Sequence, residues 1–280
     1  MFSSLNPRMI RLSLSFEETV QAASDYGFEG VELDQASLVG VPPEDLKQRI
    51  QGAGLRVGGF SVPVDFAHGE SVYEEGLRAL PGLAARAAAV GATRCTLGVR
   101  PWSDDLPWKE NWRFTVQRLQ PVAAILAEHG CRLGLEYIGP ETSRRGHRYE
   151  FIHTMEEALS LGREIGSGTG LLLDSWHWYT AKETPADIAR LTNDDVVSVH
   201  INDAPAGLRV DEQMDLERLL PRASGVIDIG GFLGALQALT YDGPVIVEPF
   251  DKSLQKLDAQ ECLRATADAL HTVMGRPHRG

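Results

Sequence analysis

The chain alternates short apolar runs with longer segments in which apolar residues recur every three or four positions. The short runs are typical of buried strands, and the longer spacing is typical of one face of a helix. Residues 77–90 follow the helical spacing, with Leu77, Leu80, Leu83 and Val90 on one face. The pattern predicts eight strands, at residues 2–5, 30–33, 55–60, 93–97, 132–136, 170–174, 196–200 and 245–248. The run 9–14 is an alternative to the first of these strands.

Residues that end and begin helices mark the boundaries between these segments. A glycine just past a helix adopts the left-handed conformation that ends it. Such glycines precede six of the predicted strands, at Gly27, Gly54, Gly91, Gly130, Gly166 and Gly243. Helix starts are equally clear, because Ser15 with Glu18 and Thr154 with Glu157 have capping-box spacing, and Pro42 opens another helix.

Each predicted strand is followed by a predicted helix, the last at residues 259–273. Eight units of about 35 residues fit a (β/α)8 barrel, in which parallel strands carry the active site at their C-terminal ends. A doubly wound open sheet is the alternative, but no Gly-x-Gly-x-x-Gly motif follows an early strand. We therefore predict an α/β protein with one TIM barrel domain over residues 1–280.

Composition narrows the class of protein. The net charge is −12, so nucleic acid and anionic membrane surfaces are poor partners. The first residues show no signal pattern, and no apolar run approaches the roughly 18 residues of a membrane helix. Cys95, Cys131 and Cys262 lack Cys-x-x-Cys spacing, which predicts reduced structural thiols and a cytoplasmic location.

Four residues that can bind a divalent metal stand at the ends of four successive predicted strands: Glu136, Asp174, His200 and Glu248. Taken singly, each carboxylate could cap a helix or pair with an arginine, and the histidine could be a hydrogen-bonded core residue. Together they would bury unpaired charge at one edge of the barrel unless a cation lay between them. We therefore predict a metal site built from the last four strands.

The segments around these residues read Leu-Glu-Tyr, Leu-Asp-Ser-Trp-His, Val-His-Ile-Asn-Asp and Val-Glu-Pro-Phe, in that order. In this series the chain resembles the sugar isomerase and epimerase superfamily of xylose isomerase-like barrels, which includes tagatose 3-epimerase, hydroxypyruvate isomerase and inosose dehydratase. The resemblance implies that Glu136, Asp174, His200 and Glu248 bind one divalent ion, with Mn²⁺ expected first and Mg²⁺, Co²⁺ or Zn²⁺ as alternatives. It also implies that His177 contacts substrate.

The ligand set suggests a reaction. A metal that holds the hydroxyl and carbonyl oxygens of a hydroxyketone stabilises the cis-enediolate left after loss of the intervening proton. Glu136 and Glu248 could then act as base and acid. Proton transfer by both on opposite faces inverts a stereocentre, whereas transfer by one exchanges aldose and ketose. His177 would donate a hydrogen bond to the developing oxyanion.

Substrate contacts are predicted from the loops that follow the strands. Trp102 and Trp176 could stack on the apolar face of a sugar, and packing is their alternative role. Related epimerases place an arginine soon after the histidine of strand seven; here Arg209 is farther away, and either Arg209 or Asp203 would make that contact. The insert 204–225, with a predicted helix at 211–220, would form a lid.

The sequence supports three functions. The first is metal-dependent isomerisation or epimerisation of a small sugar or ketopolyol. The second is a lyase, because the same enediolate can expel a β-hydroxyl in an inosose or a 3-dehydroshikimate-like ring. The third, an endonuclease IV-like repair enzyme, conflicts with the acidic charge and lacks the Asp-x-His pair after strand seven. We expect a small carbohydrate as partner, no nucleic acid and no membrane, and the resemblance is compatible with a homo-oligomer.

Overall fold

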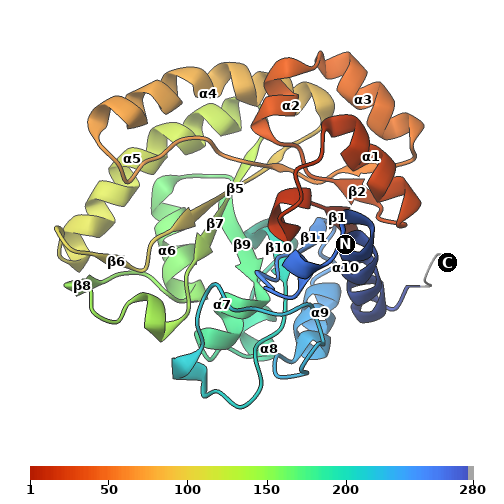
Figure 1. Cartoon of the computed structure of the whole chain (residues 1–280). Coiled ribbons are helices and arrows are strands. Elements are labelled where there is room, and N and C mark those ends of the chain that lie inside the picture. Colours follow the sequence, from red (N-terminus) through yellow and green to blue (C-terminus); the bar gives the residue numbers. More distant parts are fainter. Residues whose placement is uncertain (277–280) are drawn as a thin grey trace.

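In a computed structural model, which describes residues 1–276, parallel strand segments form the centre of the molecule and helices surround them (Figure 1). Their order in the sheet is β3-β2-β1-β11-β10-β9-β7-β5-β4. The segments are β1 (Phe2–Leu5), β2 (Gly30–Val31), β3 (Arg56–Val57), β4 (Phe60–Ser61), β5 (Arg94–Val99), β7 (Arg132–Tyr137), β9 (Thr169–Asp174), β10 (Val196–Ile201) and β11 (Pro244–Val247).

The two ends of this order are consecutive in the chain, and this closes the sheet into a barrel. β3 pairs with β2, and β4 pairs with β5. Gly58 and Gly59 connect β3 to β4 in the chain. The predicted strand 55–60 is therefore wrong as one strand, because it forms two pieces. A Cβ atom at Gly58 would overlap the carboxyl group of Glu32, and one at Gly59 would overlap the carbonyl of Arg94. The close approach of these neighbours explains the break and the glycine pair.

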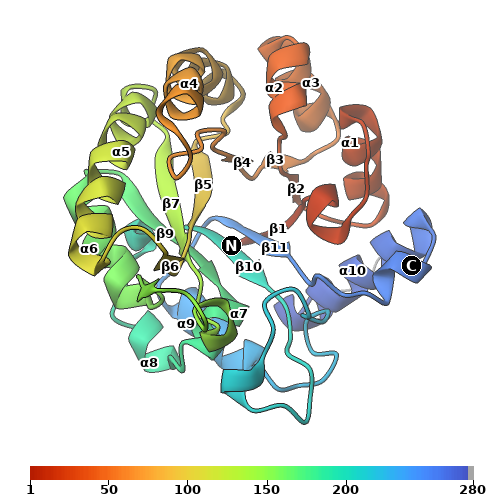
Figure 2. The ribbon, with the colours of Figure 1, turned by 60° about the vertical axis from the view of Figure 1, so that its left-hand side comes forward.

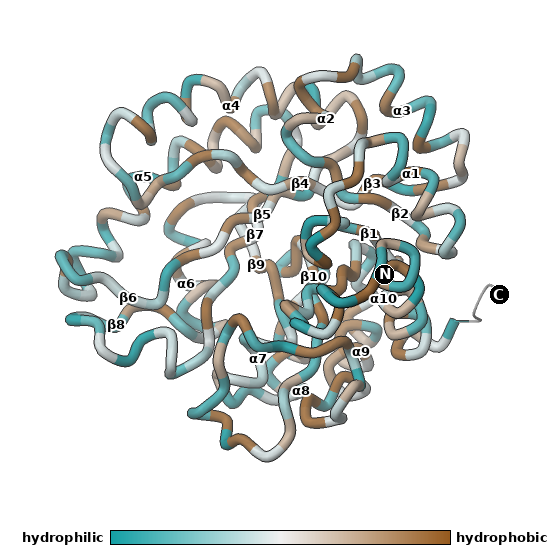
Figure 3. The backbone as a smooth tube through the Cα atoms, viewed as in Figure 1, coloured by the Kyte–Doolittle hydropathy of each residue, from teal (hydrophilic) through white to brown (hydrophobic). Residues whose placement is uncertain are grey.

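Helices follow the strands and cover the outside of the barrel, which confirms the predicted (β/α)8 alternation. Figure 2 shows α4 and α5 side by side, and in Figure 3 both helices alternate between hydrophilic and hydrophobic positions. The helices are α1 (Phe16–Asp25), α2 (Gln35–Gly40), α3 (Pro43–Gly52), α4 (Glu70–Val90), α5 (Trp108–Glu128), α6 (Met155–Ile165), α7 (Ser175–Thr180), α8 (Pro185–Ile188), α9 (Ile229–Ala238) and α10 (Ala259–Met274).

Short elements complete the architecture. β6 (Trp102–Ser103) and β8 (Tyr149–Glu150) form a small antiparallel pair. Residues 7–10, part of the run that competed for the first strand, form a 3-10 helix instead. The 3-10 helices are η1 (Pro7–Ile10), η2 (Glu141–Ser143), η3 (Asn193–Asp195), η4 (Val210–Glu212) and η5 (Leu254–Lys256).

The predicted helix boundaries are largely confirmed. Ser15 and Thr154 both form capping boxes with the glutamate three residues on. The glycines that precede β2, β3, β5 and β7 all have positive φ angles, as a left-handed helix end requires. Two of the six predictions are wrong: before β11 the left-handed residue is Thr240, with a φ of 56°, and not Gly243, and Gly166, before β9, has a φ of 149° and a ψ of 173°, outside the left-handed helical region.

The segment between β10 and α9 differs most from expectation. No helix covers 211–220, and only η4 is regular there; Figure 2 shows this segment, in cyan, extending beyond the barrel. Asp203 and Leu219 exchange two backbone hydrogen bonds, of 2.8 and 2.9 Å. The carboxylate of Asp203 also accepts hydrogen bonds from the backbone N–H groups of Ser224, Gly225 and Ile227. These contacts fold the segment back as a loop, because they compete with a helix for the same chain.

The cysteines and the apolar character of the helices can be compared directly with the predictions. Cys95, Cys131 and Cys262 are all buried and unbridged, as predicted for structural thiols. Over residues 1–276, none of the helices combines the length and apolar character needed to cross a bilayer.

Candidate metal centre and active site

The structure brings Glu136, Asp174, His200 and Glu248 together at one end of the barrel. One ligand atom from each residue lies within 4.8 Å of all the others. Strand register explains the convergence, since His200 of β10 is level with Asp174 of β9, and Glu248 directly follows β11. The predicted grouping of these four side chains is therefore present in the structure.

Arg218 lies within this group, although the sequence analysis did not select it. One guanidinium nitrogen, Nη1, donates to Asp174 Oδ2 at 2.9 Å and to Glu248 Oε2 at 2.8 Å. The other, Nη2, donates to Asp215 Oδ1 at 2.8 Å. The side chain is only 2% exposed. The loop between β10 and α9 thus supplies a buried positive charge to a group of acidic residues.

The two oxygens of Asp174 have separate partners. Oδ1 accepts from the backbone N–H of Trp176 at 2.6 Å and from Asn202 Nδ2 at 3.0 Å, whereas Oδ2 faces Arg218. The first contact caps α7, the helix that carries His177. Asn202 was not selected from the sequence, but its amide joins Asp174 to the backbone carbonyl of Glu248 at 3.3 Å.

The proximity of these groups shifts their pKa values. Burial raises the pKa of Glu136 well above its ordinary value, and the charge of Glu248 raises it further. Burial also opposes ionisation of Asp174, but Arg218, the two histidines and Asn202 together outweigh it and lower the pKa of Asp174. For His200, burial is outweighed by Glu248, which raises the pKa of the imidazole to about 9. The cluster therefore holds charges of both signs together with one carboxyl group that favours its protonated form.

The donor set fits a divalent cation. Three carboxylates and one imidazole are suited to Mn²⁺ and related ions. Glu136 Oε1 is buried and has no hydrogen-bond partner among residues 1–276, although an unpaired buried oxygen is costly. It lies 3.9 Å from His200 Nδ1 and 3.8 Å from His177 Nε2, too far for hydrogen bonds. A cation bound among the four side chains would satisfy this oxygen.

His177, for which the resemblance implies a substrate contact, lies beside the cluster. Its Nδ1 accepts the backbone N–H of Gly139 at 3.2 Å, so a neutral ring carries its hydrogen on Nε2. Nε2 lies 3.8 Å from Glu136 Oε1 and 3.2 Å from Arg218 Nη2. Because a guanidinium nitrogen only donates, the Arg218 contact requires Nε2 to accept, and a neutral ring cannot accept at both of its nitrogens. Burial lowers the pKa of His177, and the Arg218 charge lowers it further, which keeps the ring neutral. His177 presents an Nε2–H group to the site in the tautomer that the Gly139 contact favours, and that tautomer excludes the hydrogen bond from Arg218.

The predicted substrate contacts have different locations. Trp102 lines the main cavity, and its ring stacks on His147 with the centroids 3.5 Å apart. Trp176 is fully buried beneath Arg218 and does not line the cavity. Arg209 is 72% exposed and pairs with Asp211 at 2.8 Å. Arg218, nine residues later in the same loop, is the arginine that reaches the cluster.

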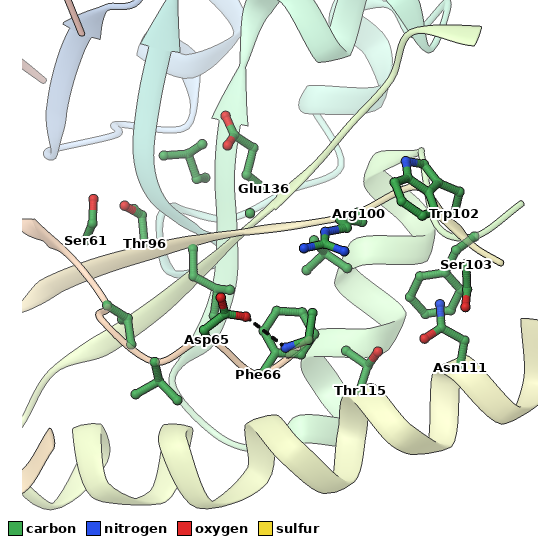
Figure 4. A pocket seen from close by; sticks show the side chains of 18 of the residues that line it. Ser61, Asp65, Phe66, Thr96, Arg100, Trp102, Ser103, Asn111, Thr115 and Glu136 are labelled. Carbon is green, nitrogen blue, oxygen red and sulfur yellow. Dashed lines mark hydrogen bonds between the residues drawn. The ribbon is translucent and has the colours of Figure 1, made fainter. Parts of the chain in front are cut away.

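Two adjoining cavities open at this end of the barrel. The larger, of about 1000 Å³, is lined by Glu136, His200 and Glu248 and by Arg100 and Trp102. Figure 4 shows Glu136, Arg100 and Trp102 among its lining side chains. The second, of about 820 Å³, is also lined by His200. Residues that line both cavities are Met9, Ser61, Val62, Pro63, Thr96 and His200. The site thus has room for a small organic molecule that extends away from the cluster.

The closed barrel and the carboxylate-rich group at its C-terminal end define the class of protein. The family model of the xylose isomerase-like TIM barrel matches residues 20–270, so the chain belongs to that family. A solved structure of a xylose isomerase domain protein from Alicyclobacillus acidocaldarius is 29% identical, with a TM-score of 0.85 over 98% of both chains.

Two curated relatives have named activities. Inosose isomerase from Bacillus velezensis is 25% identical over 168 residues, which cover 59% of this chain and 56% of that protein. A 3-dehydroshikimate dehydratase from Pseudomonas putida is 28% identical over 152 residues, or 54% of this chain and 23% of that protein. The match thus spans about half of the first relative and about a quarter of the second.

Proposed function

We propose that this protein is a divalent metal-dependent isomerase or epimerase that transfers a proton next to the carbonyl group of a small polyhydroxy ketone, with cyclic inososes as the first substrates to test. The observation that carries the proposal is the position of Glu136 and Glu248 in one buried cluster beside His177. The relationship to inosose isomerase supports the choice of substrate.

The four clustered residues would hold the cation, for which Mn²⁺ is the first candidate. When bound, it would supply the positive charge that makes the proton beside the carbonyl acidic enough to remove. The remaining work belongs to the side chains. Glu248 accepts hydrogen bonds from Arg218 and His200 and is suited to act as the base. Glu136, with its raised pKa, is suited to return a proton as the acid.

His177 and Arg218 would position the substrate. The Nε2–H group of His177 would donate to the substrate oxygen on which negative charge develops. Arg218 would make the substrate contact that the sequence predicted for either Arg209 or Asp203, because Arg218 is the arginine within reach of the cluster and Asp203 is bound to the backbone of its own loop. Trp102 would form one wall of the site.

Proton exchange in heavy water provides the test. Mn²⁺-loaded protein is incubated with inososes and ketoses, and deuterium incorporation is measured by mass spectrometry and proton NMR. We expect one deuterium beside the carbonyl of an accepted substrate, with product of unchanged composition. Metal-free protein and the Glu136→Gln variant serve as controls. Absence of exchange with every ketone, by a folded and metal-loaded protein, would rule out the proposal.

Arg100 favours a second candidate, a dehydratase acting on an acidic ring. Its side chain lines the larger cavity, with the guanidinium carbon 5.6 Å from the centroid of the Trp102 ring, and none of the ion pairs found among residues 1–276 includes it. A carboxylate on the substrate would be a suitable partner. The similarity to a 3-dehydroshikimate dehydratase agrees with this. The two reactions are distinguished by their products, because water loss gives a conjugated, ultraviolet-absorbing ring with a mass lower by one water.

A further inference from the structure

We propose that Glu32 is a specificity-determining residue that binds one hydroxyl group of the substrate, on the side of the barrel away from the metal cluster. The inference rests on the proposed function in so far as the ligand is a polyol. The cluster is built from β7, β9, β10 and β11, whereas Glu32 directly follows β2. The residue thus lies at the C-terminal end of a barrel strand, where family folds of this kind place their substrate groups.

Glu32 shares a cavity with the cluster. It lines the second cavity, of about 820 Å³, whose lining also includes His200. The residue is partly exposed, so its carboxyl group is not sealed into the core. A ligand that is held at the cluster and extends into this second cavity would therefore approach Glu32.

The surrounding backbone makes room for this carboxyl group. Ser4 Oγ donates to Glu32 Oε1 at 2.8 Å and fixes its position. A Cβ atom at Gly58 would overlap Glu32 Oε1 and would lie 2.7 Å from Ser4 Oγ. Gly58 is also the point at which the third barrel strand is interrupted. The backbone on both sides of Glu32 stays hydrogen-bonded to this segment, from Gly58 N to Val31 O and from Leu33 N to Gly59 O, so the missing side chain at Gly58 is what leaves space for the carboxyl group.

Two other polar side chains of this cavity, Asp34 and Asn6, already have partners. Asp34 accepts from Arg8 at 2.8 Å and from Ser37 Oγ at 2.5 Å, and it caps α2. Asn6 caps η1 through its side chain. Glu32 has a less committed carboxyl group, and burial raises its pKa to about 7, so that it can donate or accept a hydrogen bond near neutral pH. Such a group suits a hydroxyl, which also donates and accepts.

Removal of either partner tests the contact. Affinity of the Mn²⁺-loaded protein is measured by calorimetry for a cyclic polyol without a carbonyl group and for its singly deoxygenated analogues. With wild-type protein, loss of one particular hydroxyl should weaken binding about 10–100-fold, as expected for a hydrogen bond to a charged or strongly polar group. With Glu32→Ala, loss of the same hydroxyl should change affinity less than about 3-fold, because the partner is already absent.

Two further variants separate recognition from folding. Gly58→Ala keeps Glu32 but removes the space for its carboxyl group, so it should also reduce discrimination at the same hydroxyl. Glu29→Ala is the matched control: Glu29 precedes β2 as Glu32 follows it, and it accepts from Ser3 N at 2.9 Å, but it lines neither of the two cavities. Glu29→Ala should keep wild-type discrimination. Circular dichroism verifies that each variant is folded.

The outcomes distinguish this inference from the proposed function. Equal losses for all analogues in wild-type and Glu32→Ala protein would overturn the role of Glu32, and so would a failure of the wild-type protein to bind any polyol. Hydroxyl discrimination that depends on Glu32, without proton exchange on any ketone, would support Glu32 and overturn the proposed reaction.

Discussion

The two halves of the barrel are built differently. β7, β9 and β10 each contain six residues and pair along most of their length. In contrast, β2, β3 and β4 contain two residues each, and the third strand is broken between its two pieces. The long strands, together with β11, carry the charged cluster, whereas β4 and the residues that follow β2 border the second cavity.

This difference reflects two requirements. Like charges can be held within 4.8 Å of each other only by a rigid backbone, because small displacements change their repulsion strongly. A cavity wall has no such requirement, and an interrupted strand allows a carboxyl group to enter it. We infer that the long strands govern the reaction, while the short strands influence which ligand fits.

The largest effect is expected on turnover, when the acidic residues of the cluster are substituted. Glu136→Gln and Glu248→Gln should each lower turnover by about 10²–10⁴-fold, because an acid or base group is removed while the shape is kept. Initial rates with saturating substrate provide the measurement. Glu141→Gln, in the loop after β7, is the control; it pairs with Arg145 on the surface and should retain full activity. Near-normal turnover in both cluster variants would contradict the assignment of acid and base.

A smaller effect is expected from Arg218, the positively charged side chain within the cluster. Arg218→Ala should lower the unfolding free energy of the metal-free protein by about 3–5 kcal/mol, because it leaves buried carboxylates without their partner. Saturating Mn²⁺ should recover most of this loss. Urea unfolding, with and without metal, measures both quantities. Arg209→Ala, an exposed arginine of the same loop, should leave stability unchanged. Equal stability of the two metal-free variants would show that Arg218 does not stabilise the cluster.

The smallest effect compares one acidic residue from each half. Burial raises the pKa of Glu183 to about 7, and Glu183 accepts from Tyr137 Oη at 2.5 Å, beside Glu136 in the long-strand half. Burial raises the pKa of Glu32 to the same value in the short-strand half. Because each pKa is higher in the folded than in the unfolded state, folding retains protons, and stability should fall as pH rises from about 4.5 to about 7.

Substitution by glutamine should remove part of that decline. Glu183→Gln should flatten the pH dependence of the unfolding free energy by about 1–3 kcal/mol over this window, and Glu32→Gln by a similar or smaller amount. The double variant should show nearly additive changes, since the two sites belong to different parts of the barrel. Denaturant unfolding at several pH values provides the measurement. A steeper decline in either variant would contradict the sign of the shift.

Local patterns were sufficient to predict the cluster. Glu136, Asp174, His200 and Glu248 each stand at the end of an apolar run, and parallel pairing brings such ends to the same edge. The helix boundaries were predictable for the same reason, because caps depend on residues three or four positions apart.

Contacts between distant parts of the chain were not predictable in this way. Arg218 lies 18 residues after His200, within an acidic segment that resembles a helix, and the Asp203 contacts that turn it inward are not encoded by spacing. Glu32 is one of 39 acidic residues, and only the overlap at Gly58 distinguishes it. The Gly58-Gly59 pair was visible in the sequence, but its effect depends on how closely Arg94 and Glu32 approach.

Because Asp174 has two roles, few substitutions at this position can preserve both. One oxygen orients the start of α7 and thereby the imidazole of His177, while the other faces the charged cluster. Asparagine could preserve the helix start but would bring no negative charge, and glutamate would keep the charge but place it farther from the backbone of Trp176. The orientation of the ring and the charge balance of the centre are therefore tied to a single side-chain length and a single charge.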